Sequence, residues 1–105
     1  FNQIISNSNI YIGAAGMTLY EILYLKIPSI VINTNKKQNK FVDYLRSNKV
    51  ITSDFYYRNV KNKQIEDSFY KLVNNNEIRK KVLKNIDKLF YNKSKLSKIS
   101  EILNI

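Results

Sequence analysis

The sequence predicts a single α/β domain, a partial Rossmann-like fold of three layers with a short parallel sheet of about three strands and additional C-terminal helices. The chain has 105 residues, 44% of them hydrophobic, which is enough for one small core but not for two domains. Short apolar runs alternate with helix-like stretches over residues 1–51, and three amphipathic patterns follow over residues 62–105.

The first region has a β-α-β-α-β pattern. The run Ser29-Ile30-Val31-Ile32 is continuously apolar after its first residue, which is typical of a strand covered on both faces. We therefore expect a parallel sheet with right-handed crossovers. The expected elements are, in order, a strand at 10–13, a helix at 17–25, a strand at 29–33, a helix at 38–47 and a short strand at 50–51.

Residues 52–61 are rich in tyrosine and asparagine and lack a period, so we expect a loop there. A turn and an N-cap are expected at residues 74–76, and Glu77 suits the dipole of the helix that follows. Three helices are predicted by apolar positions at helical spacing: Ile65, Phe69, Leu72 and Val73; Ile78, Val82, Ile86 and Leu89; Leu96, Ile99 and Leu103.

The composition excludes several kinds of chemistry. Cysteine and histidine are both absent, so this chain has no disulfide, no thiolate or imidazole metal site, no cysteine nucleophile and no histidine base. An Asp-x-Asp cation site is also missing, and we expect no metal and no cofactor. No apolar run approaches the roughly 20 residues of a membrane-spanning helix, so we expect a soluble, cytoplasmic protein. Because the sequence starts with Phe1, we expect a fragment of a longer protein.

The net charge of +10 raises the question of an anionic partner. Residues 36–105 hold 17 basic and 7 acidic groups, whereas residues 1–35 hold one of each. Lysine, asparagine and isoleucine each occur 15 times, as an AT-rich coding sequence would produce. The lysines alternate with apolar residues at helical spacing, which favours a solvated helix face over a nucleic-acid surface.

The stretch Gly13-Ala14-Ala15-Gly16 joins the first predicted strand to the first predicted helix. In a parallel sheet this is the carboxyl edge, where α/β proteins bind ligands. Small residues let a ligand approach the backbone, and the unpaired amides of the first helical turn suit a phosphate or diphosphate. The spacing is neither a P-loop nor the dinucleotide fingerprint. A tight strand-to-helix turn explains the same residues equally well.

Glu21 is the only charged residue in the first 25 positions. Thr18 and Glu21 are three residues apart, so they lie on one side of the helix near its N-terminus. A carboxylate in an apolar helix needs hydrogen bonds or solvent, and a cleft offers solvent and sugar hydroxyls. We favour a ribose-binding role for Glu21 over a partly exposed residue stabilised by the helix dipole.

The stretch "SNIYIGAAGMTLYEILYLKIPSIVINTNKKQN" resembles the nucleotide-binding half of GT-B-fold enzymes. The likeness is greatest to the UDP-sugar hydrolase of pseudaminic acid biosynthesis and its spore-coat-polysaccharide relatives, and it covers roughly residues 8–50. The positions that match the family's pattern are Gly13, Gly16, Thr18, Tyr20, Glu21, Pro28 and Gln38.

The resemblance implies a UDP-sugar site. It implies that Glu21 holds the ribose and that Gln38 with Asn39 borders the sugar. It further implies that an N-terminal domain outside this sequence carries histidine-based chemistry. We therefore assign no catalytic residue here and expect this chain alone to be inactive. For the parent enzyme we favour a UDP-sugar hydrolase over a glycosyltransferase. The residues implied to hold the diphosphate are Gly13, Ala14, Ala15, Gly16, Met17 and Thr18.

This chain departs from the family pattern at several positions. Ala15 replaces a glycine and Met17 replaces a serine, so phosphate binding would depend on backbone amides and Thr18. Lys26 stands where a helix-ending glycine is usual, and a left-handed lysine costs roughly 1–2 kcal/mol, which leaves open a different helix end. Asn48 replaces another glycine, in a conformation that asparagine tolerates.

A function from another class stays open, a non-catalytic basic module that binds nucleic acid or acts as a regulator. Tyr56, Tyr57, Arg58 and Lys61 put aromatic rings beside cations in the expected loop. Single-stranded nucleic-acid sites use this pairing, although surface loops of such composition are more common.

Overall fold

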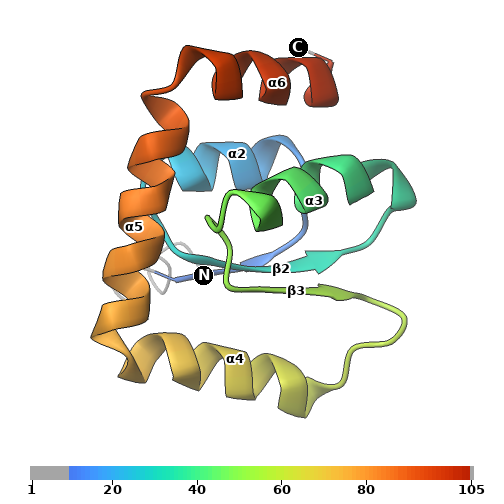
Figure 1. The fold of residues 1–105 in the computed structure, drawn as a ribbon. Coiled ribbons are helices and arrows are strands. Elements are labelled where there is room, and N and C mark those ends of the chain that lie inside the picture. Colours follow the sequence, from blue (N-terminus) through green and yellow to red (C-terminus); the bar gives the residue numbers. More distant parts are fainter. Residues whose placement is uncertain (1–9, 105) are drawn as a thin grey trace.

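A computed structural model describes residues 10–104, which are built around a three-stranded parallel sheet (Figure 1). The strands are β1 (Tyr11–Gly13), β2 (Ser29–Asn33) and β3 (Ser53–Tyr56), in the order β1-β2-β3. Both pairings are parallel, so all three carboxyl ends lie at one edge of the sheet. The predicted fold class, a mixed α/β domain with a short parallel sheet, is confirmed.

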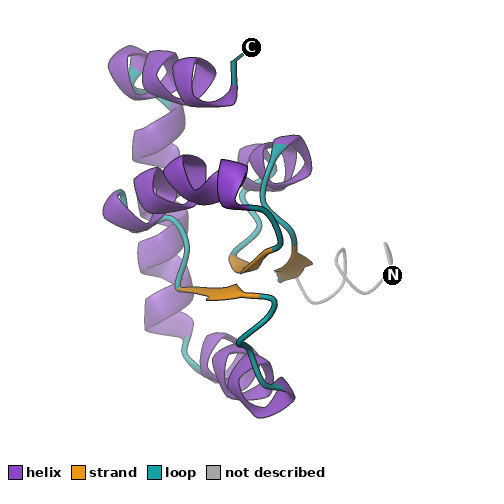
Figure 2. Cartoon of the chain, turned by 90° about the vertical axis from the view of Figure 1, so that its right-hand side faces the viewer, coloured by secondary structure: helices purple, strands orange, loops and turns teal. Residues whose placement is uncertain are grey.

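Helices cover both faces of the sheet (Figure 2). On one face lie α2 (Met17–Tyr24) and α3 (Asn39–Ser47), the latter preceded by the 3-10 turn η1 (Lys36–Gln38). On the other face lies α4 (Asn62–Asn74). This gives the three layers that the sequence predicts.

The last two helices close the structure on one side. Helix α5 (Asn76–Phe90) runs from α4 past the sheet to the layer that contains α2. Helix α6 (Lys93–Leu103) then lies against α3 and α5. The three predicted C-terminal helices are therefore present, and none of the helices described is long and apolar enough to cross a membrane.

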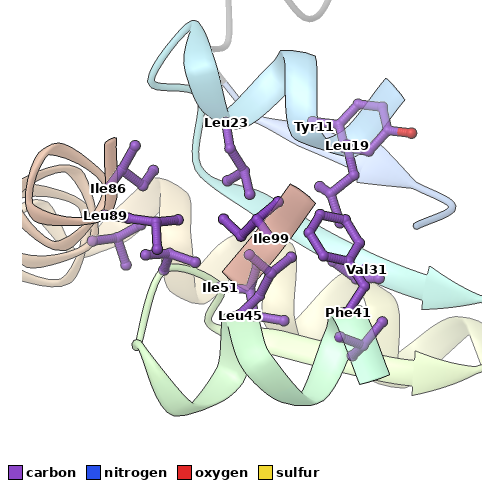
Figure 3. Packing of buried hydrophobic residues seen from close by; sticks show 13 residues of the cluster. Tyr11, Leu19, Leu23, Val31, Phe41, Leu45, Ile51, Ile86, Leu89 and Ile99 are labelled. Atoms are coloured by element: carbon purple, nitrogen blue, oxygen red, sulfur yellow. The ribbon is translucent and has the colours of Figure 1, made fainter. Parts of the chain in front are cut away.

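The main core lies between the sheet and the layer of α2, α3, α5 and α6 (Figure 3). Helical spacing places Leu19 and Leu23 of α2 on one face, and both are buried. Each fully buried aliphatic or aromatic side chain contributes about 1.5–3 kcal/mol of transfer free energy. A smaller cluster of Ile10, Ile30 and Leu72 attaches α4 to the opposite face of the sheet.

The predicted third strand is wrong in position. Val50 and Ile51 are buried but belong to the connection after α3, whereas β3 occupies residues expected to form a loop. Within the part of the chain that the structure describes, the strand Ser53–Tyr56 pairs with β2 alone, and it is half-buried along its length. A strand at the edge of a sheet needs little apolar surface, so its sequence lacks the continuous apolar run of β2.

Two lysines take the left-handed conformation at helix ends. Lys26 has φ 63° and follows α2, where its amide donates to Leu23 O and the next amide donates to Ile22 O. This is the Schellman arrangement that glycine usually adopts, so the helix ends as it would with glycine. After α3 the left-handed residue is Lys49, with φ 57°, whereas the residue considered from the sequence, Asn48, has φ −88°.

The asparagines at the later helix starts act as caps. Asn75 Oδ1 accepts from the amide of Ile78, and Glu77 lies in the first turn of α5, as the sequence predicts. Asn92 Oδ1 accepts from the amide of Lys95 at the start of α6. Each cap satisfies one amide that the helix itself leaves unpaired.

Candidate functional site

The predicted site residues lie at the carboxyl edge of the sheet. Helix α2 begins after β1, η1 and α3 follow β2, and a turn at residues 57–59 follows β3. The arrowheads of β2 and β3 mark this edge in Figure 1, and α2 starts on the same side. Three chain segments that are distant in sequence therefore meet there.

Gly16 has a backbone conformation that is nearly exclusive to glycine, with φ 116° and ψ −156°. A Cβ atom on Gly16 would lie 3.5 Å from Nε2 of Gln38, so the structure brings these two predicted site residues together. Ala15 is not among the described residues with positive φ. The alanine that replaces a glycine there therefore imposes no backbone strain.

Gly13 is small for a reason within the strand. A Cβ on Gly13 would clash with the hydroxyl oxygen of Tyr11, whose ring covers this position. The hydroxyl of Tyr11 donates to Ala14 O at 3.3 Å, and burial raises the pKa of Tyr11. The protonated hydroxyl of Tyr11 thus supports the loop between β1 and α2 through its bond to Ala14 O. The sequence analysis did not assign this role to Tyr11.

The N-terminus of α2 has free hydrogen-bonding capacity. No side chain among residues 10–104 caps it, and the amide of Tyr20 makes the first bond back to Gly16 O at 3.1 Å. The amides of residues 17–19 precede that bond and have no acceptor within the helix. Met17 and Thr18 are both exposed, so this end of α2 is open to solvent. Such an end attracts anions.

Glu21 lies on the exposed side of α2. It has no ion pair or side-chain hydrogen bond among residues 10–104, and its neighbours along the helix, Met17, Tyr24 and Leu25, are 46%, 66% and 65% exposed. Solvent therefore meets the hydration requirement of the carboxylate. Thr18 and Glu21 share this exposed side, as their spacing predicts.

Asn39 is held in place by a residue that sequence reasoning missed. The Nδ2 group of Asn33, the buried last residue of β2, donates to Oδ1 of Asn39 at 2.6 Å. Oδ1 of Asn33 accepts from the amide of Asn35 at 3.2 Å. Asn39 therefore keeps its own Nδ2 donors for a ligand. A polar residue at the end of an apolar strand is the sequence signal that points to Asn33.

Positive charge accompanies this segment. Lys36 and Lys37 in η1 and Lys40 in α3 flank the Gln38–Asn39 pair in sequence, and all three are exposed. Their ammonium groups add to the partial charge at the start of α2, and both favour an anionic ligand.

A large hollow of the described structure lies elsewhere. Its volume is about 630 Å³, and Ile10 and Pro28, which precede β1 and β2, place it at the amino edge of the sheet. Arg79 in its wall is engaged in closing α4, since its guanidinium donates to the carbonyls of Leu72 and Val73. The predicted diphosphate and ribose residues, 13–18 and Glu21, do not line this hollow.

No family model, curated protein or solved structure matches the chain. The structure joins Gly16 to Gln38 and orients Asn39, and it places Thr18 and Glu21 together on the exposed side of α2.

Proposed function

We propose that this chain is the nucleotide-binding half of a UDP-sugar enzyme that serves surface-polysaccharide or nonulosonic acid biosynthesis. Of the two activities, we favour a UDP-sugar hydrolase over a glycosyltransferase. The observation that carries the proposal is the start of α2. Gly16 turns the chain in a glycine-only conformation, the amides of residues 17–19 are uncapped, and Gln38 lies against the turn. This arrangement supports binding of a diphosphate next to a polar group.

In this function the chain holds the leaving nucleotide. The amides at the start of α2 and the hydroxyl of Thr18 donate to the diphosphate and stabilise the charge that develops on it as the sugar bond breaks. The resemblance implies a histidine-based mechanism and this chain has no histidine, so we assign the base that activates water or an acceptor hydroxyl to another domain. Gln38 and Asn39 then lie on the sugar side.

Glu21 is assigned to the ribose. Its carboxylate is exposed one turn after Thr18 and has no described partner within the protein. A ribose diol offers two hydroxyl donors that a carboxylate accepts together. This role explains why a charge is present on the otherwise apolar surface formed by Met17, Tyr24 and Leu25.

A titration of the 105-residue chain with UDP, followed by NMR of the backbone amides, tests the proposal. Half of a site lacks the contacts of a closed cleft, so we expect a Kd of about 1 mM. The largest shifts are expected at residues 15–18 and at the side chain of Gln38. Shifts confined to Tyr56–Lys61, or no shift at millimolar UDP, would show that the start of α2 is not the diphosphate site.

The variant Glu21→Gln separates binding from stability. We expect its free energy of unfolding to stay within about 0.5 kcal/mol of the parent, because the side chain is exposed and unpaired. Loss of a charge-assisted acceptor costs about 1.5–3 kcal/mol, which would move the Kd for UDP beyond about 10 mM. Glu66→Gln on α4 is the matched control and should bind like the parent. Reduced stability with unchanged UDP binding would make Glu21 a structural residue.

The alternative function, a basic module for single-stranded nucleic acid, is supported by the Tyr57–Arg58 pair. The guanidinium carbon of Arg58 lies 5.5 Å from the ring centroid of Tyr57. A titration with mixed-sequence RNA at two salt concentrations distinguishes the two functions. RNA binding that weakens steeply with salt would favour the module, whereas UDP binding that persists in salt would favour the nucleotide-sugar site.

A further inference from the structure

The turn after β3 carries an ordered aromatic residue. Tyr57 is 44% exposed, and its ring lies 5.2 Å from that of Tyr56 in a tilted arrangement. Nε of Arg58 donates to the hydroxyl of Tyr57 at 2.9 Å. These contacts hold the Tyr57 ring in place while leaving a large part of it accessible.

Hydrogen bonds connect Tyr57 to the sugar side of the candidate site. The amide of Tyr57 donates to the carbonyl of Asn33 at 3.0 Å, which fixes the backbone of the turn to the end of β2. The side chain of the same Asn33 donates to Asn39. Asn33 therefore positions both Asn39 and the backbone of Tyr57, one through its side chain and the other through its carbonyl.

The strand order sets the spacing along this edge. Adjacent strands lie about 4.8 Å apart, and the register places the end of β3 two residues further along the sheet than the end of β1, so these two ends lie about 12 Å apart. A ligand with its diphosphate over the end of β1 and its sugar beside Gln38 and Asn39, after β2, extends toward the end of β3. The span is comparable to a diphosphate followed by one pyranose ring.

We propose that Tyr57 contacts the sugar of the bound nucleotide sugar and so determines which sugar is accepted. This inference depends on the proposed function. The electron-rich face of a tyrosine ring attracts the polarised C–H groups of a pyranose, and the side chain loses little conformational freedom because it has only two rotatable bonds. Arg58 acts as a positioning residue through the hydroxyl of Tyr57.

The test compares UDP with UDP-N-acetylglucosamine on the same chain. We expect the sugar nucleotide to bind the parent about two- to tenfold more tightly than UDP, the range that one aromatic contact gives. It should also shift the amides of Tyr57 and Arg58, which UDP alone should leave unmoved. Tyr57→Ala should abolish the difference in affinity and leave binding of UDP unchanged. Tyr57→Phe keeps the ring but loses the hydrogen bond from Arg58, so it should retain part of the difference.

The control is Tyr70→Ala, because Tyr70 is an exposed tyrosine on α4, on the other face of the sheet. It should bind both nucleotides like the parent. Equal binding of the two nucleotides by the parent, or a Tyr57→Ala variant that keeps the difference, would overturn the role of Tyr57 while leaving the UDP site intact. Failure of UDP itself to bind would overturn the proposed function and this inference with it.

Discussion

The substitution Gly16→Ala tests the conformation on which the candidate site depends. Gly16 lies at φ 116° and ψ −156°, a region that other residues enter at a cost of about 1–3 kcal/mol. The added methyl group would lie 3.5 Å from Nε2 of Gln38, an ordinary van der Waals contact that adds no further cost. Alanine also restricts the unfolded chain, which offsets about 0.4–1 kcal/mol. We therefore expect a net loss of about 0.5–2 kcal/mol.

Thermal and urea unfolding of the 105-residue chain measure this loss. For a domain of this size, about 1 kcal/mol corresponds to a change in Tm of about 4–8 °C. Ala14→Gly is the control, because it removes one methyl group from the same loop at an exposed residue that lacks positive φ. Ala14→Gly should lower the free energy of unfolding by about 0.4–1 kcal/mol, because glycine only increases the conformational entropy of the unfolded chain. A Gly16→Ala variant as stable as the parent, or more stable, would refute the conformation assigned to Gly16.

Two further predictions concern stability. Lys49→Gly should raise the free energy of unfolding by about 0.5–1 kcal/mol in urea titrations, because it relieves a left-handed side chain at φ 57°. Lys26→Gly should raise the free energy of unfolding by less than Lys49→Gly does, because it also removes the ion pair between Nζ of Lys26 and Oδ1 of Asp87 at 2.8 Å. A larger gain for Lys26→Gly than for Lys49→Gly would contradict this explanation. Arg46→Lys should lower the free energy of unfolding by about 0.5–1 kcal/mol, because it loses the bidentate contact to Asp54 that joins α3 to β3. An unchanged midpoint of urea unfolding would show that this contact is dispensable.

The helices and the first two strands could be predicted from the sequence because their signals are local. Leu19 and Leu23 repeat at helical spacing, as do the apolar residues of α4, α5 and α6, and each repeat defines the face that is buried. The apolar run of β2 reflects a central strand covered on both faces. A property of the chain over five to fifteen residues was enough in each case.

The third strand could not be located in the same way. Val50 and Ile51 have the composition of a strand but fill the core from a connection, and Ser53–Tyr56 forms the strand with half-buried residues. Pairing with β2 decides this assignment, and the partner lies more than twenty residues away in the sequence. The left-handed Lys26 and Lys49 are a similar case, because the hydrogen bonds that close the helix outweigh the local preference of lysine.

In the candidate site, too, some residues could be identified from the local sequence, whereas others depend on tertiary contacts. Gly13 to Thr18 could be selected as candidates because a short small-residue link between a strand and a helix fits either an anion site or a tight turn. Glu21 could be selected because it is the only charged residue in the first 25 positions. Only the tertiary structure places Gln38 against Gly16 and connects Tyr57 through Asn33 to Asn39. The physical reason is the parallel sheet, because each strand ends at the same edge and so assembles one surface from three segments that carry no local signal of their proximity.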